Sequence, residues 1–213
     1  MKLVLDPDWL VQCDMERIIV HWTAGSYDIS ENDLAHYHFL VDRNGVGYLG
    51  DNPVSGNAAN PEGEVTSHTK NKNTGSIGIA VAAMGNAVEN PFDPGPWPIT
   101  QTQWEALCEA IAQLCDRYLI PVMPETVLMH GEVQETLGVK QDGKWDIGRL
   151  PFALEYKNSA EVGDLMREMV ATILDMGSGA EEEHVRPKPV TVSITVESDG
   201  PVRLIINGVE IGT

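Results

Sequence analysis

Short apolar runs alternate with stretches of helical periodicity along most of this chain, and this alternation constrains the fold more than any other feature. Residues 17–21, 76–83 and 127–129 are apolar enough to predict buried strands. Between the last two runs, apolar side chains recur at spacings of three and four over residues 104–118, which predicts an amphipathic helix. Strands that alternate with helices favour an α/β domain with a mixed central β-sheet flanked by helices.

Local signals indicate where several of these elements begin or turn. Ser30 and Thr100 precede helical stretches and are suited to cap them, because a side-chain hydroxyl accepts from the free N–H groups of a first helical turn. The apolar runs 38–41 and 46–49 are separated by residues 42–45, which end in Asn-Gly. This pair between apolar runs predicts a β-hairpin.

The last quarter of the chain differs in character. Residues 160–176 carry an apolar stripe at helical spacing, so we assign them to a main domain of residues 1–176. Residues 177–189 contain Gly-Ser-Gly, three glutamates and two prolines, which predicts a linker. Residues 190–213 alternate apolar and polar residues around two turns, which predicts a small β-meander. Three strands this short need a partner surface, so we expect this segment to bind something or to form a homo-oligomer.

The formal net charge of −18 argues against whole classes of partner. Nucleic acids and anionic membranes attract basic surfaces, so we expect neither as a partner. No apolar run approaches the roughly 18 residues that predict a membrane span. The chain begins MKLVLDPD, which is too short and too soon acidic for a signal peptide. We therefore expect synthesis in the cytoplasm without a signal peptide.

The three cysteines, Cys13, Cys108 and Cys115, are odd in number and form no CxxC motif, which argues against a disulfide framework. Cys108 and Cys115 share one face of the predicted helix about 10 Å apart, beyond the roughly 7 Å that separates the Cα atoms of a disulfide. We expect both to be small core side chains.

Three residues at the ends of predicted strands or in loops that follow them could together hold a metal ion: His21, His130 and Asp146. A catalytic zinc site needs three protein ligands and one open position for water, and two imidazoles with one carboxylate meet that need. Bound zinc lowers the pKa of its water towards about 7 and polarises the carbonyl that is attacked. A single histidine at a strand end is more often structural than a ligand, so the sequence around each residue decides.

Five segments in matching order resemble the zinc amidases, a family that includes phage lysozyme-type amidases, bacterial muropeptide amidases and animal peptidoglycan recognition proteins. The segments are IIVHWTAG at 18–25, YHFLVDRNG at 37–45, SHT at 67–69 with NTGSIGI at 73–79, HGE at 130–132 and KWDIG at 144–148. The resemblance implies the fold of that family. It also implies a zinc-dependent N-acetylmuramoyl-L-alanine amidase, a hydrolase that cuts the amide bond between N-acetylmuramic acid and L-alanine in peptidoglycan.

The resemblance further implies a role for each matching residue. The three ligand candidates would bind one zinc ion per chain. Lys144 would stabilise the oxyanion of the tetrahedral intermediate. Tyr37 would orient or deprotonate the attacking water. His68 would line the cleft and bind substrate.

Two positions depart from the pattern of the family. Members that recycle muropeptides carry a glutamate where this chain has Ala80, so the chain is more similar to the phage and recognition-protein types. The family usually has proline after the aspartate ligand, and here that residue is Ile147.

These features favour a phage or prophage endolysin, a bacteriolytic enzyme that degrades the cell wall once a separate pore releases it. Residues 190–213 would then bind the wall or mediate self-association. The alternatives are a non-catalytic peptidoglycan-binding module, a cytoplasmic muropeptide-recycling amidase, and another zinc amide hydrolase on the same fold. A complete ligand set distinguishes the enzymes from a pure binder, which need not keep it.

Overall fold

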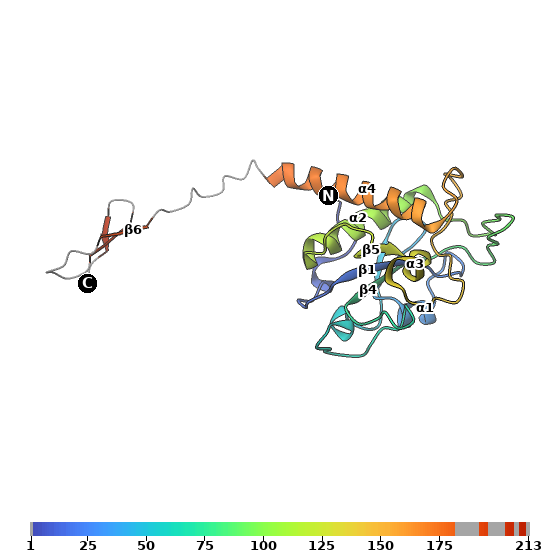
Figure 1. Ribbon diagram of the computed structural model, residues 1–213, viewed down its shortest axis with the longest axis horizontal. Coiled ribbons are helices and arrows are strands. Elements are labelled where there is room, and N and C mark those ends of the chain that lie inside the picture. The colour runs from blue at the N-terminus through green and yellow to red at the C-terminus, as the bar shows by residue number, and fades with distance from the viewer. Residues whose placement is uncertain (1, 182–191, 196–202, 207–208, 212–213) are drawn as a thin grey trace. The chain divides into compact units, whose positions relative to one another are not determined.

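A five-stranded sheet organises the first of two compact units of this protein (Figure 1). The structure is a computed structural model that describes residues 2–181, 192–195, 203–206 and 209–211. Residue contacts divide the chain into Met1–Gly177 and Ser178–Thr213. The strand order of the large sheet is β3-β2-β4-β1-β5. Its strands are β1 (Arg17–Trp22), β2 (Phe39–Val41), β3 (Gly47–Leu49), β4 (Ser76–Val81) and β5 (Val127–Met129).

The sheet is mixed, as predicted. Strands β2, β4, β1 and β5 run parallel to one another, whereas β3 pairs antiparallel with β2. The hairpin between β2 and β3 turns at the expected place, where the Asp42 N–H donates to the Val46 carbonyl over 2.9 Å. Gly45 has a φ of +77°, a conformation that glycine adopts at little cost.

Helices flank the sheet, and the predicted caps are confirmed. At the start of α1, the Ser30 hydroxyl accepts from the Asp33 N–H while the Asp33 carboxylate accepts from the Ser30 N–H, which makes a reciprocal capping box. The Thr100 hydroxyl caps α2 by accepting from the Gln103 N–H. The helical segments are η1 (Pro7–Trp9), α1 (Glu31–His36), η2 (Val54–Asn57), α2 (Gln101–Tyr118), η3 (His130–Glu132), α3 (Val133–Leu137) and α4 (Ser159–Glu181).

The two faces of β1 meet different parts of the domain, because successive side chains of a strand point to opposite faces. Ile18 and Val20 are fully buried in the main core, which also contains the apolar side chains of α2 and α4. Ile19 packs in a second, smaller cluster with Leu128 and Val133, the first residue of α3. His21 follows Ile19 by two residues, so its side chain belongs to the face opposite α2.

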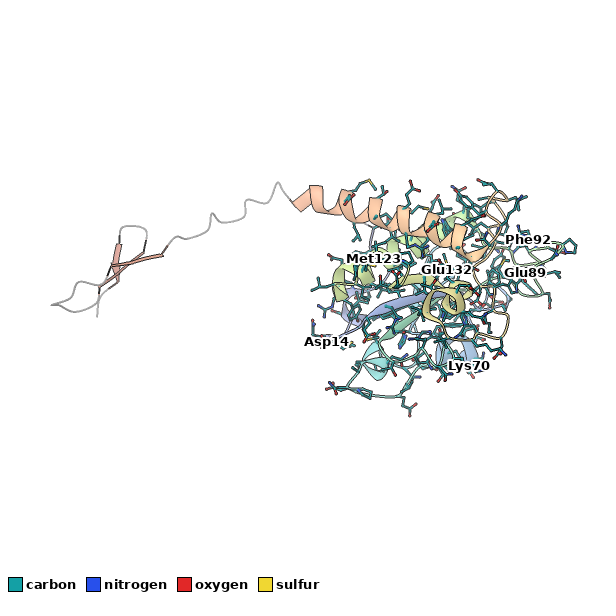
Figure 2. All side chains as sticks on the ribbon, viewed as in Figure 1. Asp14, Lys70, Glu89, Phe92, Met123 and Glu132 are labelled. Carbon is teal, nitrogen blue, oxygen red and sulfur yellow. The ribbon has the colours of Figure 1, made fainter. Side chains whose placement is uncertain are left out.

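A buried ion pair joins α4 to the segment that follows β5. The Arg167 guanidinium donates to both carboxylate oxygens of Glu132, over 3.0 and 3.2 Å, and to the Val127 carbonyl over 3.0 Å. Glu132 also accepts from the Met129 N–H over 2.8 Å. Glu132 lies within the body of the domain (Figure 2). A Cβ atom at Gly163 would come within 2.2 Å of Glu132, so α4 approaches this closely only with glycine there.

The C-terminal unit contains the predicted three-stranded meander. Strand β7 (Arg203–Ile206) pairs antiparallel with both β6 (Val192–Thr195) and β8 (Val209–Ile211). Helix α4 extends to Glu181, so residues 177–181 of the predicted linker are helical instead. The remainder of that linker, residues 182–189, lies outside the described residues.

Two further predictions can be compared with the structure. Cys108 and Cys115 are buried in the core and, with the half-buried Cys13, form no disulfide among the described residues. Burial raises the pKa of the Cys115 thiol to about 12, as suits a packing side chain. Among the described helices, none combines the length and apolar character needed to cross a bilayer.

Replacing Arg167 by methionine should strongly destabilise the protein, because it leaves the Glu132 carboxylate buried without its partner. Breaking a buried pair from one side typically costs about 3–5 kcal/mol. Asp164 supplies the matched control, since it also contacts Arg167, over 2.7 Å, but is 77% exposed. Asp164→Ala should change the free energy of unfolding by less than about 1 kcal/mol. Urea unfolding measures both, and equal effects would show that the burial of Glu132 is not what matters.

Candidate metal centre

Three strand and loop segments bring the predicted ligands together. His21 lies near the end of β1, His130 directly follows β5, and Asp146 lies in the loop before α4. Strands β1 and β5 are parallel neighbours in which Val20 pairs with Met129, so the next residue of each chain segment is a histidine at the same edge of the sheet. The Gly131 N–H donates to the Asp146 carbonyl over 2.6 Å, which holds the loop beside His130.

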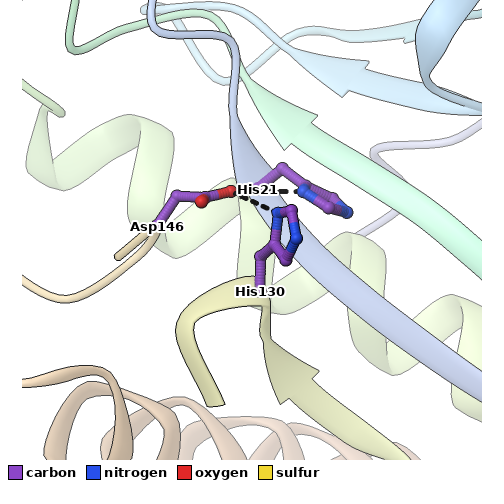
Figure 3. Close-up of side chains that lie close together, drawn as sticks. All are labelled: His21, His130 and Asp146. Atoms are coloured by element: carbon purple, nitrogen blue, oxygen red, sulfur yellow. Dashed lines mark hydrogen bonds and ion pairs between the residues drawn. The ribbon is translucent and has the colours of Figure 1, made fainter. Parts of the chain in front are cut away.

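The ring nitrogens that face the centre are the Nδ1 atoms of both histidines (Figure 3). Asp146 Oδ2 lies 3.2 Å from His21 Nδ1 and 3.1 Å from His130 Nδ1. All three candidate ligand atoms lie within 4.8 Å of one another, and all three side chains are buried. Among the described residues, this is the one group of histidine, cysteine and acidic side chains with the spacing of a metal site.

Burial dominates the electrostatics of the cluster. It lowers the pKa of His21 from the ordinary 6.5 to about 4, against an opposing hydrogen-bonding contribution from Asp146, so His21 is neutral at pH 7. Burial opposes ionisation of Asp146, but contacts with His130 and His21 outweigh it and hold the pKa of this carboxyl below its usual value. The site therefore presents a carboxylate beside a neutral imidazole, the charge states in which these groups bind metals.

The donor set fits a divalent transition metal. Two imidazole nitrogens and one carboxylate oxygen converge from three backbone segments, and such a set is typical of catalytic zinc sites that keep a position for water. The outward nitrogens of the two rings are engaged elsewhere: His21 Nε2 lies 3.2 Å from His68 Nδ1, and His130 Nε2 lies 3.0 Å from Gln141 Oε1. The inward nitrogens are thus the ones available to a metal.

Sequence reasoning did not identify Gln141. Its side chain is 4% exposed and bridges His130 to the carbonyls of Lys70 and Val139. No local pattern marks such a residue, because a glutamine in a polar loop is ordinary and its contacts are tertiary.

Two of the other predicted site residues, Tyr37 and His68, contact His21 of this cluster. The Tyr37 ring lies 5.2 Å from that of His21, and its hydroxyl donates to the Trp22 carbonyl over 3.4 Å. Burial, with the charges of Asp146 and Asp33, raises the pKa of Tyr37, so the phenol stays protonated. His68 is 9% exposed and contacts His21 directly.

Lys144 is exposed and stands beside a surface cavity. Lys144 comes two residues before Asp146 in the sequence, and its positive charge contributes to lowering the pKa of His21. The cavity has a volume of about 320 Å³, and Lys144 and Trp145 line it together with Glu135 and Ser159. Among the described residues, the Lys144 ammonium has no hydrogen bond or ion pair, so it is available to a ligand.

The two departures from the family pattern, Ala80 and Ile147, both lie next to ligand candidates. Ala80 pairs with His21 across β1 and β4 and is fully buried. It alternates with Ile79 and Val81, which belong to the main core, so position 80 is on the face of the sheet that carries His21. Ile147 is buried, and the peptide bond that joins it to Asp146 is cis.

A mixed sheet with two histidines and an aspartate clustered at the carboxyl ends of its parallel strands is typical of a metal-dependent hydrolase. The chain belongs to the N-acetylmuramoyl-L-alanine amidase family, whose model matches residues 12–149. The protein thus belongs to a peptidoglycan amidase family, and its His21, His130 and Asp146 could bind a metal.

Solved structures offer more distant similarities. The endolysin of bacteriophage Ph2119 from Thermus scotoductus MAT2119 is 18% identical, with a TM-score of 0.44 over 77% of this chain and 87% of its own. The endolysin amidase LysCS from Clostridium intestinale URNW is 20% identical, with a TM-score of 0.39. The match covers 62% of this chain and 88% of LysCS. The amidase AmiD from E. coli, in complex with a substrate, is 22% identical, with a TM-score of 0.38. The match covers 55% of this chain and 49% of AmiD. A search of curated proteins gave no match.

Acidification should destabilise the metal-free protein before its carboxylates titrate. Burial lowers the pKa of His21 to about 4 and of His38 to about 3, and it also lowers that of His68. In the unfolded chain these histidines titrate near about 6.5, so below that pH the unfolded state binds protons that the folded state does not. The free energy of unfolding should therefore fall between about pH 7 and pH 5.5. Urea unfolding in the presence of a chelator measures it, and constant stability over this range would contradict the shifts.

Proposed function

We propose that this protein is a zinc-dependent N-acetylmuramoyl-L-alanine amidase that hydrolyses the amide bond between N-acetylmuramic acid and L-alanine. The observation that carries the proposal is the complete cluster of His21, His130 and Asp146 within a chain of the amidase family. A module that only binds peptidoglycan has no need for three converging metal ligands, so the intact set favours the enzyme.

The three buried ligands would hold one zinc ion per chain. When bound, zinc supplies an acidified water and polarises the carbonyl of the scissile amide. The protein contributes rigidity, because each ligand side chain is buried and comes from a different backbone segment. A site held in this way needs little reorganisation during the reaction.

Lys144 and Tyr37 are the side chains that we assign to the transition state. The Lys144 side chain is exposed, its charge acts on His21, and its ammonium would balance the negative charge that develops on the amide oxygen. Because the pKa of Tyr37 is raised, its phenol is a poor base at neutral pH. We therefore assign Tyr37 to orienting the attacking water by hydrogen bonding.

We further propose an endolysin-like role in cell-wall degradation. Ala80 supports it, since a muropeptide-recycling enzyme of this family carries a glutamate at the position that faces the site beside His21. The charge of −18 disfavours attraction to an anionic wall by bulk electrostatics, so peptidoglycan must be recognised by the shaped site or by the C-terminal strands.

The test of the reaction is cleavage of purified muropeptides by the purified protein. We expect stem peptides with a free L-alanine amine and intact glycan, with activity lost in chelator and restored by zinc. Elemental analysis should find one zinc ion per chain. Zinc binding without any cleavage would instead support the binding module.

Replacing Lys144 by alanine should lower kcat by about 10²–10³-fold with zinc content and fold unchanged, as is typical when an oxyanion donor is removed. Lys140 provides the matched control: it is in the same loop, its side chain is 80% exposed, and its ammonium lies 3.5 Å from Asp142. Lys140→Ala should leave turnover unchanged. Near-normal kcat in Lys144→Ala would remove the oxyanion role.

A chain that ends at Glu181 should keep its activity on soluble muropeptides. This truncation retains α4 with its Arg167–Glu132 pair and removes β6, β7 and β8. What we expect to weaken is association with whole sacculi or with another copy of the chain, measured by pelleting and light scattering, because exposed strand edges favour such pairing. If turnover of the soluble substrate disappeared, the C-terminal strands would belong to the catalytic domain.

A further inference from the structure

The outward nitrogen of each candidate ligand histidine lies at one end of a chain of hydrogen-bonded groups. The other end of each such chain is a backbone carbonyl. A carbonyl oxygen only accepts hydrogen bonds. The group that contacts the carbonyl must therefore be the donor. The carbonyl end of each chain of groups favours hydrogen on the outward nitrogen of the ligand histidine.

The first chain starts at Ser76 and passes through His68 to His21. His68 Nε2 lies 3.3 Å from the Ser76 carbonyl and must donate to it. Among the described residues, no carboxylate is hydrogen-bonded to the buried His68 ring, whose hydrogen-bonding partners are Ser76, His21 and Thr69. A neutral ring with a bare Nδ1 is therefore the favoured state. That Nδ1 lies 3.2 Å from His21 Nε2, and two bare nitrogens would repel at this distance. His21 Nε2 therefore donates, which leaves His21 Nδ1 with a free lone pair.

The second chain starts at Lys70 and Val139 and passes through Gln141 to His130. The Gln141 amide nitrogen lies 3.0 Å from the Lys70 carbonyl and 3.2 Å from the Val139 carbonyl, so both of its hydrogens have acceptors. This fixes the orientation of the amide and places Oε1 3.0 Å from His130 Nε2. An amide oxygen only accepts, so His130 Nε2 donates, which in a neutral ring leaves the Nδ1 lone pair free for a metal.

We propose that His68 and Gln141 are positioning residues that hold His21 and His130 in the Nε2–H tautomer, so that both Nδ1 lone pairs are directed at the metal. The inference rests on the proposed metal centre and deepens it. Asp146 Oδ2 then faces two bare nitrogens at 3.1 and 3.2 Å, an arrangement that repels unless a cation lies between them. Outer partners of this kind fix the orientation and tautomer of metal-bound histidines.

One loop supports both histidines. His68 holds His21, and two residues later the Lys70 carbonyl holds Gln141. The Lys70 ammonium also pairs with Asp142 over 2.6 Å, which joins this loop to the one that carries Asp146, and Lys70 lies at the edge of the domain (Figure 2). A Cβ atom at Gly78 would come within 2.4 Å of the His68 ring, so β4 leaves room for His68 only with glycine there.

In this arrangement His68 has a different role from substrate binding. Both of its ring nitrogens have partners within the protein, and the side chain is 9% exposed. A positioning residue and a substrate-binding residue differ in what their removal changes: the first lowers metal affinity, whereas the second raises KM and leaves metal affinity alone.

The affinity for zinc alone, measured by competition with a chromophoric chelator, tests the proposal. Gln141→Leu and His68→Phe keep the volume but remove the acceptor, and each should weaken zinc binding by about 10–100-fold. Gln141→Glu keeps an oxygen that accepts from His130, so its affinity should exceed that of Gln141→Leu. Equal zinc affinities in these two Gln141 variants would overturn the positioning role of Gln141. Wild-type zinc affinity with a raised KM in His68→Phe would overturn the positioning role of His68.

Gln103 provides the matched control. It is buried, and its amide likewise donates to two carbonyls, those of Val41 over 3.0 Å and Ala82 over 3.1 Å. No hydrogen bond joins its described side chain to a candidate ligand. Gln103→Leu therefore removes a similar buried glutamine and should leave zinc affinity within about two-fold of wild type. A loss as large as in Gln141→Leu would show that general destabilisation explains both.

Imidazole ¹⁵N spectra of the wild-type protein with one equivalent of zinc provide a second measurement that needs no variant. We expect hydrogen on Nε2 and zinc bound through Nδ1 at both His21 and His130. Zinc bound through Nε2 of either ring would overturn the positioning role at that ring. A protein that binds no zinc at all would instead contradict the proposed metal centre itself.

Discussion

The rest of the structure depends on the convergence of two imidazoles and one carboxylate in a buried site. Parallel pairing of β1 and β5 places His21 beside His130, and a backbone hydrogen bond from Gly131 to Asp146 brings in the third group. Burying such groups is costly unless each polar atom has a partner. The outward nitrogens have partners in His68 and Gln141, and the inward ones face Asp146, where a metal ion would complete the set.

Around this cluster the domain is arranged in two supporting parts. On one side, Arg167 of α4 binds Glu132 and thereby holds the segment that carries His130. On the other side, the loop that contains His68 and Lys70 contacts both histidine systems. The chemistry can therefore be disturbed from positions that never touch a substrate, which is expected of sites whose ligands must be held within fractions of an ångström.

Membership of the amidase family and the geometry of the cluster both support the proposed reaction. The family match covers residues 12–149, and every candidate ligand lies inside that range. The charge of Lys144 acts on His21, and the ring of the protonated Tyr37 lies 5.2 Å from that of His21. In the proposed reaction both would act on an amide whose oxygen gains negative charge during attack by water.

The sequence by itself determined the sheet strands, the caps at Ser30 and Thr100 and the turn at Gly45, because these depend on neighbouring residues and on local backbone preferences. Ordered motifs also identified the ligand candidates. Only the tertiary structure decided how those ligands are held. Gln141 meets carbonyls from a distant loop, and Arg167 binds Glu132 from α4. No residue pattern along the chain encodes such contacts, since they exist only once remote segments are brought together by packing of the sheet and helices.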